Sequence, residues 1–98
     1  MAASFYDRIA ACIRDGDMTT ADVSSWFDRP YHTVWFWIRY KRTPRCTRLQ
    51  QKRLTRRLEL LEYALRKGRG IPPPIDMSQH ERPRYIMKIR HELETGNL

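Results

Sequence analysis

The sequence predicts an all-α protein of four to five helices, and three observations lead to this fold class. Apolar residues recur with the period of an α-helix through most of the chain, whereas no segment alternates as a half-buried strand does. Capping side chains or prolines precede the periodic runs, and glycine or proline follows most of them. The length of 98 residues is that of one small domain with a modest core, which excludes a large enzyme.

The first two helices are short, and each has a capping signal. Ser4 with Asp7 predicts a first helix that ends at residues 15–17. Thr19, followed three positions later by an acidic residue, predicts a second helix that ends near Asp28.

The third helix is expected from Pro30 to Tyr40, because proline is favoured in a first helical turn. Thr47 with Gln50 predicts a longer fourth helix that continues to Lys67 before a terminating glycine. Its leucines recur at intervals of four, three and four, which predicts a seam for packing or oligomerisation: Leu54, Leu58, Leu61 and Leu65.

A proline-rich segment divides the chain. Residues 70–74 are expected to form an extended spacer, followed by a last helix from about Pro83 to Thr95. The sequence therefore predicts a helix-turn-helix domain with its packing helix over residues 1–69, and a spacer with a C-terminal helix over residues 70–98 that is available to a protein partner.

Positive charge is concentrated in the middle of the chain. The net charge is +8, of which residues 1–28 contribute −3, residues 29–58 contribute +10 without a single acid, and residues 59–98 contribute +1. Such a basic tract favours a polyanionic partner, nucleic acid before an anionic membrane surface, because its field speeds association with phosphate polymers. No apolar run reaches the length of a membrane span, so a soluble protein is expected.

The second and third helices, joined by a tight turn and leading into the basic tract, form an arrangement that the DNA major groove accepts. Over residues 19–44 the chain resembles the helix-turn-helix of phage repressors and Cro-like regulators, through Val23, Ser24, Phe27, Asp28, Val34 and Trp37. Asp28 stands where that family usually has glycine, and is expected to adopt the left-handed conformation. Arg29 stands where the family has an apolar residue.

The resemblance implies sequence-specific binding of double-stranded DNA by a phage-type transcriptional regulator. Such a protein would act as a dimer or higher oligomer in the cytoplasm of a bacterial or phage-infected cell, associated with the nucleoid. The residues expected to read bases are Tyr31, His32, Thr33 and Phe36. The residues expected to contact phosphates are Thr20, Arg29, Arg39, Lys41, Arg42 and Arg45.

Three residues near this site have open interpretations. His32 is either a base reader or a solvated residue at the helix start. Trp35 is expected to pack on the first or the fourth helix, whereas Phe36 is expected to contact thymine methyl groups and sugars. Further basic residues along the fourth helix either extend the row of phosphate contacts or solvate that helix: Arg48, Lys52, Arg53, Arg56 and Arg57.

Two other binding functions stay open at the level of sequence. Phage small terminase subunits and transposition cofactors place assembly helices after a helix-turn-helix, and the order of elements here is similar. Aromatic residues interleaved with arginines also suit an RNA-binding module: Tyr31, Trp35, Phe36, Trp37 and Tyr40.

An enzyme is not expected, because the sequence contains no catalytic triad spacing, paired carboxylate motif or glycine-rich phosphate loop. No cofactor or metal ion is expected either, since cysteines and histidines are not clustered. Cys12 lies on the apolar side of the first helix and is expected to be a buried apolar residue.

Overall fold

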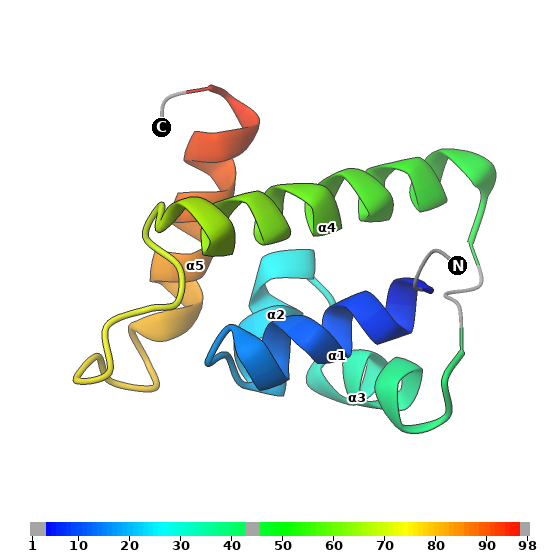
Figure 1. Cartoon of the computed structure of the whole chain (residues 1–98), viewed down its shortest axis with the longest axis horizontal. Coiled ribbons are helices and arrows are strands. Elements are labelled where there is room, and N and C mark those ends of the chain that lie inside the picture. Colours follow the sequence, from blue (N-terminus) through cyan, green and yellow to red (C-terminus); the bar gives the residue numbers. More distant parts are fainter. Residues whose placement is uncertain (1–3, 43–45, 97–98) are drawn as a thin grey trace.

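The computed structural model describes residues 4–42 and 46–96, and within these ranges the chain forms helices joined by turns and loops, without a strand. The helices are α1 (Phe5–Asp15), α2 (Thr20–Phe27), α3 (Tyr31–Arg39), α4 (Arg48–Lys67) and α5 (Arg82–Glu94), shown in Figure 1. This confirms the all-α fold of four to five helices, with a longer fourth helix and a C-terminal helix after a proline-rich segment.

Local capping explains where the helices begin and end. The Ser4 side chain accepts a hydrogen bond from the backbone N–H of Asp7 at the start of α1. Thr19 forms a reciprocal capping box with Asp22 at the start of α2, and the Thr47 side chain accepts from the N–H of Gln50 in a second box at the start of α4. Gly68 ends α4 in the left-handed conformation.

The helices are arranged so that α3 and α4 lie on opposite sides of α1 and α2. Figure 1 shows α4 spanning the top of the molecule, α1 and α2 beneath it, and α3 at the bottom. Among the described residues, α3 packs on α1 and α2, whereas α4 packs on α1, α2 and α5. The surfaces of α3 and α4 that face away from the core therefore point in different directions.

The leucine seam of α4 packs inside the chain. Leu54, Leu58 and Leu61 are buried in the hydrophobic core, and Leu65 is half-buried against it. Leu60 and Ala64 are also buried and make the covered face of α4 wider than the narrow seam of a two-helix pair. This wider face arises because three helices pack on α4.

The C-terminal helix shares this core. Ile86, Ile89 and Leu93 of α5 are buried together with the residues of α1, α2 and α4, and α5 packs most extensively on α2. Ile71, in the proline-rich segment, is also buried. One face of residues 71–96 is therefore occupied by the chain's own core.

Candidate nucleic-acid interface

The turn between α2 and α3 has the geometry of a left-handed helix end. Asp28 has φ 55° and ψ 48°, as expected from its place where the resembling family has glycine. The N–H of Arg29 donates to the Ser24 carbonyl at 3.0 Å, so the chain reverses tightly before Pro30, the N-cap of α3. An aspartate can occupy this conformation at modest cost because its short polar side chain tolerates the left-handed region.

Two arginines that are distant in the sequence donate hydrogen bonds to carbonyls at the C-terminal end of α2. The Arg57 guanidinium of α4 donates to the Phe27 carbonyl, and the Arg90 guanidinium of α5 donates to the Trp26 carbonyl, each at 2.8 Å. The Trp26 indole N–H donates in return to the Arg57 carbonyl at 2.8 Å. Burial, and secondarily the charge of Arg90, lower the pKa of Arg57.

The position of Arg57 corrects an expectation. Arg57 belongs neither to a phosphate track nor to a solvated face of α4, because its guanidinium is committed to the end of α2. Helix ends leave carbonyls without an intrahelical partner, and a side chain that satisfies one of them is held in place.

The inward face of α3 fixes which of its residues point outward. Val34 and Trp37 are buried, and the Trp37 ring packs edge-on against Phe5 and Phe27 with centroids 5.7 and 6.4 Å away. Ile38 is half-buried beside them. With 3.6 residues per turn, the opposite face of α3 consists of positions 32, 35, 36 and 39, flanked by 31 and 40.

The outward face of α3 is unusually aromatic. Tyr31, Trp35, Phe36 and Tyr40 have exposed fractions of 55%, 42%, 45% and 54%. This overturns the expectation that Trp35 packs on the first or the fourth helix, because Val34 and Trp37 already take the inward positions. The pattern of those two residues was the signal in the sequence that could have placed Trp35 outside.

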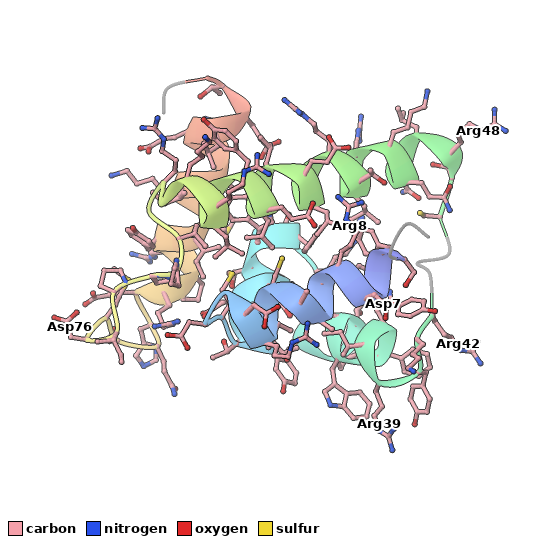
Figure 2. The ribbon with its side chains drawn as sticks, viewed as in Figure 1. Asp7, Arg8, Arg39, Arg42, Arg48 and Asp76 are labelled. Carbon is pink, nitrogen blue, oxygen red and sulfur yellow. The ribbon has the colours of Figure 1, made fainter. Side chains whose placement is uncertain are left out.

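The four residues expected to read bases differ in their exposure to solvent. Tyr31, His32 and Phe36 are exposed, whereas Thr33 is half-buried on the flank of α3. Arg39 stands seven positions after His32, two turns along the same face, and Figure 2 shows its side chain pointing away from the body of the protein. Arg39, expected to contact phosphate, therefore shares the outward face with His32.

Basic side chains follow α3 without an intervening acid. Arg39, Lys41 and Arg42 are exposed, and the Arg39 and Arg42 guanidinium carbons lie 5.9 Å from the ring centroids of Tyr40 and Phe36. Residues 29–58 contain no carboxylate. This end of α3 therefore combines aromatic surface with exposed positive charge.

Other expected phosphate contacts lie at the opposite end of the motif. Arg29 is half-buried in the turn, and Thr20 is half-buried in the first turn of α2. The carboxylate of Asp22, two positions after Thr20, accepts from the Arg82 guanidinium at 3.0 Å. Arg45 lies outside the described residues.

The basic residues of α4 lie apart from the outward face of α3. Arg48, Lys52, Arg53 and Arg56 are exposed along α4. Figure 2 shows Arg48 at the right-hand end of α4, at the top of the view, with Arg42 and Arg39 well below it. The acid-free tract that is continuous in sequence is thus divided between two sides of the protein.

The groups that could support other chemistry are inaccessible or dispersed. Burial raises the pKa of the Cys12 thiol to about 11, which makes it a poor nucleophile. No three His, Cys, Asp or Glu side chains gather as a metal site would require within residues 4–42 and 46–96. No helix in the same two ranges has both the length and the apolar character of a membrane span.

Comparisons of the chain with protein-family models, with curated proteins and with solved structures find no match. The resemblance to phage repressors and Cro-like regulators therefore stays a prediction from the sequence pattern.

Proposed function

We propose that this protein binds double-stranded DNA in a sequence-specific manner, with α3 in the major groove. The observation that carries the proposal is the outward face of α3. There His32, Phe36 and Arg39 are exposed beside further basic residues, and residues 29–58 contain no acidic one. An α-helix with its side chains is roughly 10–12 Å wide and the major groove is roughly 12 Å wide. The left-handed turn at Asp28 and the packing of α2 on α3 support the same placement.

The use of this binding that we favour is transcriptional regulation, with a homodimer reading two half-sites. The alternative is an assembly subunit, such as a small terminase or a transposition cofactor, in which α4 and the segment after the three prolines would serve assembly. The leucine seam of α4 and the apolar face of α5 are largely buried within this chain, so neither this alternative nor the homodimer can use them as its interface. The RNA alternative is weakened because Trp37, one of the aromatics proposed for stacking, is also buried.

Selection from a random pool of duplexes with the full chain tests the proposal. We expect enrichment of a common sequence, and binding to it about 10³-fold or more tighter than to random duplex at the same salt concentration. Equal affinity for the enriched and the random duplex would contradict sequence-specific binding. Preference for unpaired RNA over both duplexes would favour the RNA-binding alternative instead.

A further inference from the structure

The outward face of α3 offers few groups that can hydrogen-bond to base edges. The nine residues of α3 contain no asparagine or glutamine, the side chains that pair with adenine in the major groove. The hydrogen-bonding side chains on this face are His32 and Arg39, with single polar groups on Tyr31, Tyr40 and Trp35. The rest of each exposed aromatic side chain is an apolar ring. Recognition by this helix must therefore draw on apolar contact.

The aromatic side chains are arranged before any ligand binds. The Tyr40 ring lies 4.6 Å from the Phe36 ring, tilted by 48°, and 6.1 Å from the Trp35 ring, nearly perpendicular to it. Arg42 lies over Phe36 and Arg39 lies over Tyr40. These contacts restrict the rings, which lowers the entropy that is lost when the face binds a partner.

The same contacts argue against two other occupants of this face. Bases of a single strand stack on open ring faces, whereas Tyr40 is packed by two rings and has a guanidinium over it. A second copy of the chain, placed face to face, would bring its own Arg39, Lys41 and Arg42 against the same positive charges. Charge complementarity instead favours the polyanionic duplex.

We infer that α3 reads the C5-methyl groups of thymines in the major groove, with Phe36 and Trp35 as the specificity-determining side chains. Thymine methyls are the apolar groups that the major groove presents, and aromatic side chains contact them directly. Arg39 and Arg42 hold the rings and contact the flanking phosphates. This inference rests on the proposed duplex binding and adds that the target is rich in thymine where α3 lies.

The test replaces thymine by deoxyuridine in the selected duplex, which removes the methyl group and leaves base pairing intact. We expect the affinity to fall about fourfold for each contacted methyl, the equivalent of burying one such group. The Phe36→Ala and Trp35→Ala variants should each bind the thymine duplex more weakly and show a smaller thymine-to-uracil ratio. Both side chains are exposed, so thermal melting of the variants should match the parent.

Lys41→Ala serves as the matched control, because Lys41 is exposed at the same end of α3, whereas Arg42 lies over the Phe36 ring. This variant should bind both duplexes more weakly while keeping the parental thymine-to-uracil ratio. Tight binding of the parent to the selected duplex with a ratio of one would overturn the inference and leave the proposed function standing. An unchanged ratio in both aromatic variants, tighter binding to the single strand, or conversion of a dimer to a monomer by Phe36→Ala would overturn it as well. Failure to bind any duplex would instead reject the proposed function.

Discussion

Asp28 shows how one residue can hold the geometry of a motif despite an unusual identity. Its left-handed conformation lets Arg29 close the end of α2, and two guanidinium groups from α4 and α5 satisfy the preceding carbonyls. Glycine would adopt the same conformation without steric cost. The chain tolerates aspartate here because the surrounding packing and hydrogen bonds fix the turn.

His32 and Lys41 should separate base reading from attraction to phosphate. His32 is exposed near the N-terminus of α3, so His32→Ala should reduce the difference between selected and random duplex by about 1–3 kcal/mol. Lys41 lies beyond α3, so Lys41→Ala should weaken binding to both duplexes by a similar factor. The measurement is a titration of both duplexes with both variants at one salt concentration.

The outcome that contradicts this assignment is an equal loss of affinity for both duplexes in His32→Ala. His32 would then be a solvated residue at the helix start. Thr33→Ala provides a graded comparison, because its half-buried side chain on the flank of α3 should contribute less to discrimination than His32 does.

At the level of elements, α2 is held at both ends by arginines of α5. Arg82 pairs with Asp22 in the first turn of α2, and Arg90 donates to the Trp26 carbonyl near its end. Between these contacts Ile86 and Ile89 are buried in the common core. Because α2 carries the turn that leads into α3, α5 positions α3 through α2.

The Asp22–Arg82 pair should make folding stability depend on acid pH. Burial opposes ionisation of Asp22, but hydrogen bonds from Arg82 and from the Thr19 backbone outweigh it and lower the pKa of Asp22 below its ordinary 3.8. The ionised carboxylate therefore stabilises the folded state above about pH 4, and this contribution is lost as the pH falls through the lower folded-state pKa.

Asp22→Asn should lower the free energy of unfolding at pH 7 by about 1–3 kcal/mol and reduce the loss of stability on acidification. Urea unfolding at several pH values measures both effects. Asp15→Asn is the matched control, since Asp15 is paired with Arg14 on the exposed surface. If the two variants have the same stability at every pH, Asp22 does not hold α5 on α2.

The sequence predicted the helices well because their signals are local. Capping boxes at Thr19 and Thr47 and the glycine after α4 lie within a few residues of the boundaries they set. Trp35 was misplaced because the five consecutive apolar residues 34–38 competed for one inward face, although the spacing of Val34 and Trp37 pointed to that face. The roles of Arg57 and Arg90 were not predictable, since each depends on a carbonyl at least 30 positions away.

At the scale of the whole molecule, the positive charge is divided between two sides. Arg39 and Arg42 follow the outward face of α3, whereas Arg48 and Lys52 lie along α4 on the far side of α1 and α2. Net charge alone attracts any polyanion from all directions. Specific docking, in contrast, requires that the basic residues beside α3 contribute more to the affinity for DNA than the basic residues on α4.

Salt dependence should reveal this division. With about four to six phosphate contacts per subunit, the slope of log affinity against log salt should be about −4 to −5 for the parent. The double variant Arg39→Ala/Arg42→Ala should reduce that slope by about two, because each contact contributes about one. Arg48→Ala/Lys52→Ala removes the same charge from exposed positions on α4 and should leave the slope near the parental value. Equal effects of the two double variants would mean that duplex DNA is attracted by the overall charge of the protein, and α3 would then have no privileged place in the interface.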